Sequence, residues 1–280
     1  MKHAQYIQSI EIEALWEGGK HIKWVLNPTV NVLSGINGVG KSTIINRSAD
    51  ALSKIHNGEI RAGEVIKGIT VKLFPEDAKS IRFDVIRSFD RPLINSDLLE
   101  KLADSRVRTE LDWQIYRLQK KYLDYQVNIG NKIIEILTSN ATPDEQMQQA
   151  ALVSGPKTKF QNIMDELFRD TDKTIDRKNN EIRFIQDGQT LSPYQLSSGE
   201  KQILVIMLTA LVENGEHCAL IMDEPEASLH IEWQKQLIGL IRELNPNAQI
   251  ILSTHSPAVI MDGWMDRVTE VDDVVVHKNA

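Results

Sequence analysis

The chain has 280 residues, 41% hydrophobic and 25% charged, so it can bury a sizeable core in one large domain with an insertion or in two small domains. Its formal net charge of −7 excludes a general polycation, so binding of nucleic acid would require a local basic surface or a basic partner. The single cysteine, Cys218, excludes a disulfide framework and a cysteine-based zinc site within the chain.

The first third of the chain predicts strands around one helix. Apolar residues alternate from Ile10 to Ala14 and again from Ile22 to Leu26, with a turn at Gly18–Gly19 between them, which predicts an antiparallel hairpin. The short apolar strand Val30–Ser34 runs into a glycine-rich loop, and apolar residues at helical spacing follow over Thr43–Ile55. Two further strands are expected at Val65–Phe74 and Ile81–Phe89.

The middle of the chain, from Asn95 to about Asp172, has a helical pattern. Six apolar residues spaced by four and three predict a long helix over Arg108–Leu137, and we expect Gly130 to bend or break it; they are Leu111, Ile115, Leu118, Tyr122, Tyr125 and Ile129. A loop is expected at Asn140–Asp144, and a second helix is expected to begin within Phe160–Phe168.

The last hundred residues alternate between strands and helices. We expect a strand pair over Glu181–Leu191, with a turn at Asp187–Gly188. The later elements are expected as a helix at Gly199–Glu213, a strand at Cys218–Met222, a helix at His230–Leu244, a strand at Gln249–Ser253 and a short strand near Arg267–Val271.

The glycine-rich loop GINGVGKST, Gly35–Thr43, matches the phosphate-binding pattern GxxxxGK[ST]. At average glycine usage, this pattern arises by chance in about 1% of chains of this length. Glycines let successive backbone N–H groups point inward around an anion, and the N-terminus of the following helix adds its dipole. We expect Lys41 to reach the β- and γ-phosphates of a nucleotide and the Ser42 hydroxyl to ligate Mg²⁺.

Two carboxylates and a histidine follow the later apolar strands. Asp223, at the tip of its strand, is suited to hold the magnesium shell, and Glu224 is suited to act as general base toward water. His255 comes after the next strand and could bind the γ-phosphate or orient the water. Taken alone, the carboxylates could be a solvated strand cap and His255 a structural residue, but the glycine loop favours the catalytic interpretation.

The segment LSSGEKQ, Leu196–Gln202, has two interpretations. Ser197 followed by Glu200 is a generic capping box at the start of a helix. Alternatively, a serine hydroxyl, the Gly199 N–H and the helix dipole could stabilise a γ-phosphate delivered from outside. The spacing of the residues does not decide between the two.

The four segments GINGVGKST, LSSGEKQ, IMDEPEASLH and STHSP together closely resemble those of ABC-type ATPase heads, in the branch of SMC-like, RecF-like and OLD-like proteins. The resemblance covers Ile10–Ser88 and Glu181–Val271. It implies an α/β P-loop NTPase fold with a mixed central sheet, an N-terminal antiparallel sheet and an inserted helical lobe. The implied domains are a nucleotide-binding core at 1–94 and 181–280 and the helical lobe at 95–180.

The resemblance also implies roles for particular residues. Asp223 is the Walker B carboxylate, Glu224 the catalytic base and His255 the switch histidine, while Ser42 and Asp223 hold the metal. The segment Ala227–His230 corresponds to the D-loop, near the dimer interface. ATP and Mg²⁺ are the implied cofactors, and the nucleotide-contacting residues are Gly35, Asn37, Gly38, Val39, Gly40, Lys41, Ser42 and Thr43, with Ser197, Ser198 and Gly199 acting across a dimer.

The sequence lacks one residue of the family pattern and does not identify another. The family usually has a glutamine after the strand that leads into its helical lobe, but Ile86–Pro92 has none, and Arg87, Asp90 or Arg91 are the candidate substitutes. An aromatic platform for adenine is also expected, with Trp16, His21 and Trp24 as candidates.

The missing glutamine, the helical insert and the absence of long coiled coils argue against a transporter subunit and against an SMC protein. Only 25 residues follow His255, so we expect no nuclease domain after the ATPase. The sequence thus predicts an ATPase that forms a homodimer around ATP and drives a separately encoded effector, such as a nuclease, or a nucleic-acid transaction, in phage defence or DNA maintenance. A nucleotide-dependent clamp with little turnover and a transporter ATPase are the alternatives.

The charge of the helical insert and the hydropathy of the chain bear on contacts with nucleic acid and membranes. The insert carries basic residues interrupted by Glu110, Asp112 and Asp124, which favours a solvated mixed-charge face over a DNA-binding one. Met1–Glu17 does not read as a signal peptide, and apolar stretches such as Ile203–Val212 are too short to span a bilayer. We therefore expect a soluble cytoplasmic protein. The basic residues are Arg106, Arg108, Arg117, Lys120, Lys121 and Lys132.

Overall fold

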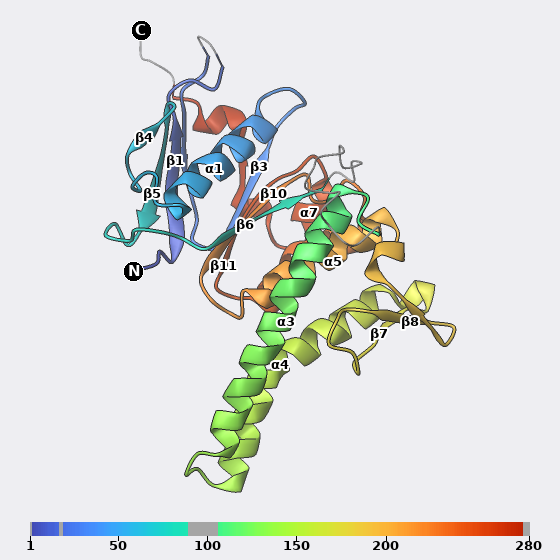
Figure 1. Cartoon of the computed structure of the whole chain (residues 1–280). Helices are drawn as coiled ribbons and strands as arrows, with labels where there is room; N and C mark the ends of the chain where they lie inside the picture. The colour runs from blue at the N-terminus through green and yellow to red at the C-terminus, as the bar shows by residue number, and fades with distance from the viewer. Residues whose placement is uncertain (1, 17–18, 89–105, 277–280) are drawn as a thin grey trace. The chain divides into compact units, whose positions relative to one another are not determined.

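The computed structural model describes residues 2–16, 19–88 and 106–276 (Figure 1). The chain divides into two compact units, which are described separately. The first comprises 1–88, 215–242 and 246–280, and the second comprises 89–214 with 243–245. Packing into compact units does not say which segments fold independently, so the domain boundaries given above remain a prediction.

The first unit contains an antiparallel sheet. Its strands are ordered β2-β1-β5-β4, with β1 at Tyr6–Ile12, β2 at Ile22–Val25, β4 at Val65–Ile66 and β5 at Ile69–Phe74. The predicted N-terminal hairpin is confirmed, since Ser9 to Ile12 of β1 pair with Ile22 to Val25 of β2. The strand predicted over 65–74 is instead two strands, because Lys67 and Gly68 adopt positive φ angles of 47° and 71° and turn the chain back on itself.

The other sheet of the first unit is entirely parallel. Its strands are ordered β12-β3-β11-β10-β6. Since all the strands run the same way, the segments that leave their carboxyl ends gather at one edge of the sheet. The strands are β3 at Val30–Ser34, β6 at Phe83–Arg87, β10 at Cys218–Asp223, β11 at Ala248–Ser253 and β12 at Val268–Glu270.

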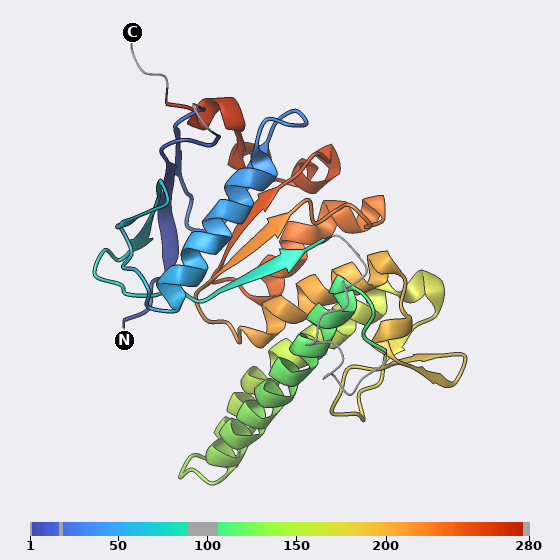
Figure 2. The same ribbon diagram turned by 45° about the horizontal axis from the view of Figure 1, so that its top comes forward.

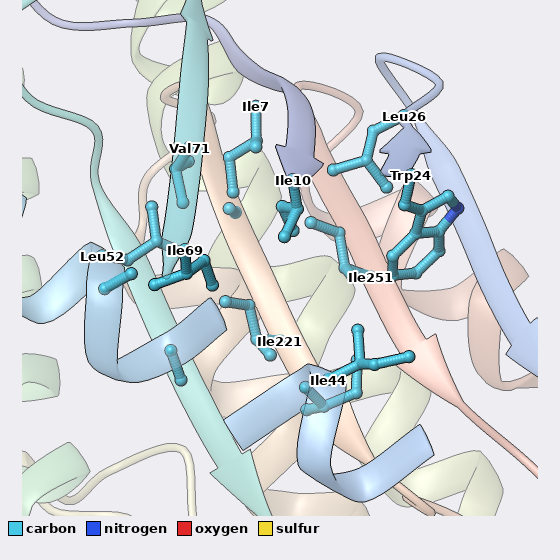
Figure 3. Packing of buried hydrophobic residues seen from close by; sticks show 14 of the residues in the cluster. Ile7, Ile10, Trp24, Leu26, Ile44, Leu52, Ile69, Val71, Ile221 and Ile251 are labelled. Atoms are coloured by element: carbon cyan, nitrogen blue, oxygen red, sulfur yellow. The ribbon is translucent and has the colours of Figure 1, made fainter. Parts of the chain in front are cut away.

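Helix α1, Lys41–His56, supplies one face of the core of the first unit. Ile44 and Leu52 on this helix are fully buried, as are Ile221 of β10 and Ile251 of β11, and Figure 3 shows these side chains pointing toward one another. Residues of the antiparallel sheet, such as Ile10, belong to the same hydrophobic cluster. Fully burying one such side chain contributes roughly 1.5–3 kcal/mol, so this packing fixes the start of α1 beside the parallel strands.

Three shorter elements and one longer helix are also described in the first unit. Helix α6 spans Ile231–Leu244, of which the last residues belong to the second unit, and α7 spans Pro257–Met261. The 3-10 turns η3 and η4 lie at Met265–Arg267 and Val271–Val274. They stand on either side of β12, the last strand of the parallel sheet.

The second unit is built on two long helices, α3 at Glu110–Leu137 and α4 at Pro143–Leu167, which run side by side in both views (Figures 1 and 2). Helix α3 continues through Gly130, so the break considered there is absent. The second helix begins at Pro143 rather than within 160–168. Thr142 and Glu145 form a capping box, and Pro143 occupies the first turn, where a proline needs no N–H partner.

The remainder of the second unit is a small sheet followed by a buried helix. Residues 187 and 188 have positive φ angles of 49° and 74° and form the predicted turn between β8 and β9. Helix α5, Ser198–Val212, is buried over most of its length and packs on α3 and α4. The other elements are η1 at Arg169–Thr171, β7 at Thr174–Ile175, β8 at Phe184–Gln186, β9 at Gln189–Leu191 and η2 at Pro193–Gln195.

Across both units, none of the helices that the structure describes is long and apolar enough to cross a membrane.

Candidate functional site

The carboxyl edge of the parallel sheet brings together the loops that carry the predicted site residues (Figure 2). The glycine loop follows β3, Asp223 and Glu224 follow β10, and the segment 253–257 follows β11. At the end of β6, the Ser88 hydroxyl donates to the backbone oxygen of Asp223 at 2.9 Å. Polar groups from four neighbouring strands therefore meet at one edge.

The glycine loop closes around the amine of Lys41. The Lys41 side chain is almost fully buried, and its Nζ donates to the backbone oxygens of Gly35 at 2.9 Å and Ile36 at 3.2 Å. Burial lowers the pKa of Lys41, and the carboxylates of Glu224, Asp223 and Glu226 oppose that shift. The amine thus lies inside a loop whose backbone oxygens it would exchange for phosphate oxygens when an anion binds.

Gly40, the last residue before α1, cannot be exchanged for another residue without strain. Its φ is 112°, and an added Cβ would lie 2.5 Å from Leu15 Cδ2 and 3.1 Å from the Trp16 ring. The indole of Trp16 therefore packs directly against the glycine loop while remaining 44% exposed. Of the other two adenine candidates, Trp24 is only 2% exposed, and His21 Nε2 is bound to Glu11 Oε1 at 2.9 Å. Trp16 is thus the aromatic ring available beside the loop.

Ser42 and Asp223 meet although 181 residues separate them in the chain. The Ser42 hydroxyl donates to Asp223 Oδ1 at 3.0 Å, and the Ser253 hydroxyl donates to the same oxygen at 2.5 Å. Oxygen ligands of this kind suit Mg²⁺, which is commonly held by one or two protein groups together with substrate phosphates. Among residues 2–16, 19–88 and 106–276, no cluster of three or more His, Cys, Asp or Glu side chains could hold a metal.

Glu224 and His255 also contact each other. His255 Nε2 lies 3.2 Å from Glu224 Oε1, and both side chains are about one third exposed. Glu224 has a φ of 48°, in the left-handed region, and its backbone N–H donates to the carbonyl of Ser253 at 3.1 Å and to its hydroxyl at 3.2 Å. A non-glycine residue held in this conformation is typical of functional sites, where the surroundings over-determine the backbone.

A buried carboxylate, Glu226, holds the segment that carries His255. Glu226 Oε1 accepts hydrogen bonds from the Thr254 hydroxyl at 2.5 Å and from the backbone N–H groups of His255 at 3.0 Å and Ser256 at 3.3 Å. The Ser256 hydroxyl donates in turn to Gln234 Oε1 at 2.6 Å. The loop after β10 and the loop after β11 are therefore fixed to each other through one carboxylate oxygen.

The segment LSSGEKQ lies in the second unit and starts α5. Ser197 is the N-cap and forms the capping box with Glu200, so the structural interpretation of this pair is confirmed. Glu200 also accepts from Lys173 Nζ at 2.8 Å. Its burial opposes ionisation, but the bonds from Lys173 and Ser197 outweigh that and hold the pKa of Glu200 below its usual value. Ser198 is exposed at the helix N-terminus.

The remaining predicted residues are placed as follows. Asn37 and Gly38 are exposed at the tip of the glycine loop, Val39 packs on the core, and Thr43 is half-buried in the first turn of α1. Gly199 is half-buried in the first turn of α5. Of the three substitutes for the missing glutamine, Arg87 ends β6, whereas Asp90 and Arg91 lie outside the described residues.

Sequence reasoning did not single out Ser253 or Glu226. Both residues lie within motifs described above, Ser253 in STHSP and Glu226 in IMDEPEASLH. Their importance comes from the pairing of β10 with β11, which sets Asp223 opposite Ser253. A signal for Ser253 existed in the chain order, because a polar residue that ends one parallel strand lies beside the residue that ends its neighbour.

A family model described as AAA domain, putative AbiEii toxin, Type IV TA system matches residues 69–262. The chain belongs to this AAA family. The retron Vc95 probable ATPase of Vibrio cholerae serotype O1 biovar El Tor is 25% identical over 187 residues, which cover 62% of this chain and 35% of that protein. The Septu protein PtuA of Bacillus thuringiensis is 44% identical over 41 residues, or 15% of this chain and 10% of that one. The chain thus matches about a third, or less, of each of these two relatives' own length.

The fold has counterparts among solved structures. The crystal structure of an SMC head bound to the C-winged helix domain of ScpA superposes with a TM-score of 0.53 and 17% identity, covering 92% of this chain and 91% of that one. The predicted fold class is thereby confirmed: a parallel sheet and an antiparallel sheet in a mixed α/β head. Family and fold together thus give an AAA-family domain with the fold of an SMC head.

Proposed function

We propose that this ATPase binds MgATP at the carboxyl edge of the parallel sheet, closes on a second copy of itself and passes that closure to a separately encoded effector in phage defence or DNA maintenance. The observation that carries the proposal is the pairing of Ser42 with Asp223 and of His255 with Glu224 beside the glycine loop. The groups that we propose for binding phosphate, metal and water thus lie at one edge.

Binding follows from the groups around the glycine loop. Lys41 would leave the backbone oxygens of Gly35 and Ile36 for the β- and γ-phosphates, which restores the charged amine that burial disfavours. The Ser42 hydroxyl and the Asp223 carboxylate would hold Mg²⁺, which supplies charge neutralisation to the phosphates. The Trp16 ring is suited to stack on the adenine.

Hydrolysis would rest on Glu224 and His255. The Glu224 carboxylate accepts a proton from water as the water oxygen attacks the γ-phosphorus, and the bond from that phosphorus to the oxygen bridging to the β-phosphate breaks. His255, held 3.2 Å from Glu224, orients the carboxylate and can bind the γ-phosphate. Positioning and charge stabilisation supply most of such catalysis, which explains why the backbone around both residues is so strongly fixed.

The homodimer and the effector are inferred from the family. Ser198 and Gly199 at the start of α5 are exposed or half-buried and would meet the γ-phosphate held by a second copy. The relatives include a retron ATPase and a Septu protein, and the SMC head of similar fold is bound to a domain of ScpA. The partner bound to the SMC head supports an ATPase that works with another protein, for which we propose an effector such as a nuclease.

A nucleotide-dependent clamp with little turnover is the principal alternative, and a transporter ATPase is the other. Such a clamp has no need of a general base. The contact between Glu224 and His255 favours hydrolysis, because it orients a carboxylate that only the chemical step requires.

Substituting Glu224 tests the proposed base. Glu224→Gln should reduce ATP turnover by about 10²–10⁴-fold and leave ATP affinity intact, because general base catalysis contributes that much. In gel filtration with ATP, this variant should accumulate as a dimer, while Lys41→Ala should stay monomeric and fail to bind ATP. Glu76→Gln, an equally conservative change at an exposed position, is the matched control. Equal turnover in Glu224→Gln and wild type would contradict the assignment of the base.

The dimer claim is tested at the start of α5. Ser198→Arg should prevent ATP-dependent dimerisation because it fills the surface on which the second nucleotide would bind. The substitution does not alter Ser197, which is the N-cap residue of α5. Ser197→Ala should cost about 1 kcal/mol of unfolding free energy through loss of the cap. If Ser198→Arg dimerises like wild type, the segment serves only as a helix cap.

A further inference from the structure

We propose that a basic groove in the second unit is a binding site for single-stranded nucleic acid. The groove consists of two adjoining cavities of about 500 and 610 Å³, each within the size range of ligand sites. Arg106, Ser192, Tyr194 and Gln195 line both cavities, so the two cavities adjoin. Its walls come from α3, from β9 and η2, and from the first turn of α5.

The charge of the groove is opposite to that of the chain. Two acidic side chains that line it are paired within it, Asp112 with Lys201 at 2.8 Å and Glu181 with Arg183 at 3.0 Å. The basic side chains exceed the acidic ones by three in a chain of net charge −7. An anion is therefore the ligand that the groove favours. The basic residues in its lining are Arg106, Arg108, Lys120, Arg183 and Lys201.

Lys121 of α3 fits the mixed-charge face that the sequence predicts for the helical insert. Lys121, one position from Lys120, lies 3.7 Å from Glu213 and points to a carboxylate rather than to the groove. The expected mixed-charge face thus describes part of the helix, while the neighbouring face carries the excess of positive charge. A sequence of interleaved charges does not show this, because the separation depends on which helix face each residue occupies.

Aromatic rings stand beside these cations. The Arg106 guanidinium lies 5.3 Å from the centre of the Tyr194 ring, and Lys120 Nζ lies 4.6 Å from the centre of the Tyr116 ring. Both rings line the groove. Contacts between a cation and an aromatic ring are weak at exposed positions, so an incoming base can take the cation's place on the ring while the cation moves to a phosphate.

The combination of rings and cations points to unpaired nucleotides. An acidic peptide would use the cations but gain little from the rings, whereas bases stack on tyrosines irrespective of sequence. In a duplex the bases are stacked on one another, so rings inside a concave site cannot reach their faces. Ser192 lines both cavities, and its hydroxyl can bond a base edge or a phosphate.

The inference goes beyond the proposed ATPase function, since binding in the groove requires no nucleotide at the glycine loop. It is tested with the full chain and a fluorescent oligothymidylate of about eight nucleotides, by anisotropy without ATP. Tyr194→Ala and Tyr116→Ala should each weaken binding roughly tenfold, while Tyr194→Phe and Tyr116→Phe should bind like wild type, because the ring is retained. Lys120→Gln should lower the slope of log affinity against log salt concentration by about 0.7.

The matched control is Lys132→Gln, which removes the same charge from the same helix roughly 18 Å further along its axis and should leave both affinity and salt slope unchanged. Equal effects of Lys120→Gln and Lys132→Gln would overturn the proposal, as would equal affinity for a duplex or retained affinity in both tyrosine-to-alanine variants. Stronger binding of ATP than of the oligonucleotide in the groove would also contradict it. ATP turnover measured on the same variants separates a failure here from a failure of the proposed ATPase.

Discussion

The two compact units hold their polar side chains in different ways. In the first, side chains from segments far apart in the chain bond one another, as Ser42 does with Asp223 and Thr254 with Glu226. In the second, helix starts are capped within a single turn, as Ser197 is with Glu200, although ion pairs such as Asp112 with Lys201 also join remote segments there. The candidate site of the first unit is therefore built from the ends of parallel strands. The second unit instead offers the N-termini of helices and a groove.

This difference has a physical cause. Parallel strands bring the ends of remote segments to one edge of the sheet. The polar groups of one loop can therefore form hydrogen bonds with those of a neighbouring loop. Helix starts leave N–H groups unsatisfied, and a local capping residue meets some of them while others stay available to an anion. Four substitutions, ordered from the largest expected effect to the smallest, probe how strongly each unit depends on its own kind of contact.

The largest effect is expected in the first unit from Gly40→Ala. The added methyl group would lie 2.5 Å from Leu15, at a φ of 112° that disfavours any side chain. The loop must shift, and the inward N–H groups lose their alignment. We expect ATP affinity to fall about a hundredfold or more, measured by calorimetry, which corresponds to roughly 3 kcal/mol.

Gly58→Ala is the matched control for Gly40→Ala. Gly58 has a φ of 73°, and an added Cβ would meet nothing within 4 Å. This variant should lose about 1–2 kcal/mol of unfolding free energy from backbone strain alone and keep its ATP affinity. If Gly40→Ala loses stability to the same extent and still binds ATP normally, the site does not depend on this close packing.

The largest effect in the second unit is expected from Glu200→Gln. The change leaves the Lys173 ammonium, 13% exposed, without its carboxylate, and removing one partner of such a pair costs about 3 kcal/mol of unfolding free energy. The pKa of Glu200 is lowered in the folded chain, so its contribution is present above the usual pKa near 4.5 and is lost as the pH falls through the folded value. Urea unfolding should therefore show a difference at neutral pH that shrinks in acid.

Glu145→Gln provides the comparison for Glu200→Gln, because Glu145 forms the same capping box with Thr142 but is exposed and is paired with no lysine in the described residues. Its effect on stability should be much smaller, although it too should shrink in acid, because the hydrogen bonds from Thr142 hold the pKa of Glu145 below its usual value. Equal losses in the two variants would mean that the capping box, not the buried ion pair, stabilises the start of α5.

The parts of the fold that could be predicted from sequence are those where local pattern and tertiary packing agree. The strand, glycine loop and helix around Lys41 follow from apolar spacing and glycine positions, as do the later strands β10 and β11. The sequence pattern predicts too short a helix α4, because residues 143–159 are largely polar and include Pro156. Their helicity rests on the capping box and on packing against α3.

The residues of the candidate site can be predicted where they belong to a known motif. They are harder to predict where the pairing of two strands determines which residues meet. The roles of Lys41, Asp223 and His255 rest on motif spacing and remain proposals. The contribution of Glu226 depends on the register of β10 and β11, which no spacing in the sequence reveals. The basic groove likewise depends on which residues face the same side of α3, and its partners η2 and α5 lie far along the chain.

Glu226→Ala should have an intermediate effect. It removes the acceptor that fixes the N–H groups of His255 and Ser256, so the His255 imidazole should lose its position beside Glu224. We expect turnover to fall about tenfold to a hundredfold with ATP affinity little changed, because a small misplacement of a catalytic group has a cost of that order.

Glu226→Gln retains one carbonyl oxygen as acceptor and should keep most of the turnover. Comparing the two variants by steady-state ATPase measurements separates the hydrogen-bonding role of Glu226 from the effect of its charge. A loss of ATP affinity as large as the loss of turnover in Glu226→Ala would show that this carboxylate supports the glycine loop rather than His255.

The smallest effect is expected from Trp16→Ala, which tests whether the ring beside Gly40 stacks on adenine. Losing one stacked base typically costs 1–3 kcal/mol, so ATP affinity should fall about tenfold, while Trp16→Phe should lose less because it keeps a ring. Inorganic tripolyphosphate, which has no base, should bind wild type and Trp16→Ala equally in calorimetry. Since Trp16 also packs on the loop, a parallel loss of tripolyphosphate binding would show that the indole supports the loop backbone and not the nucleotide base.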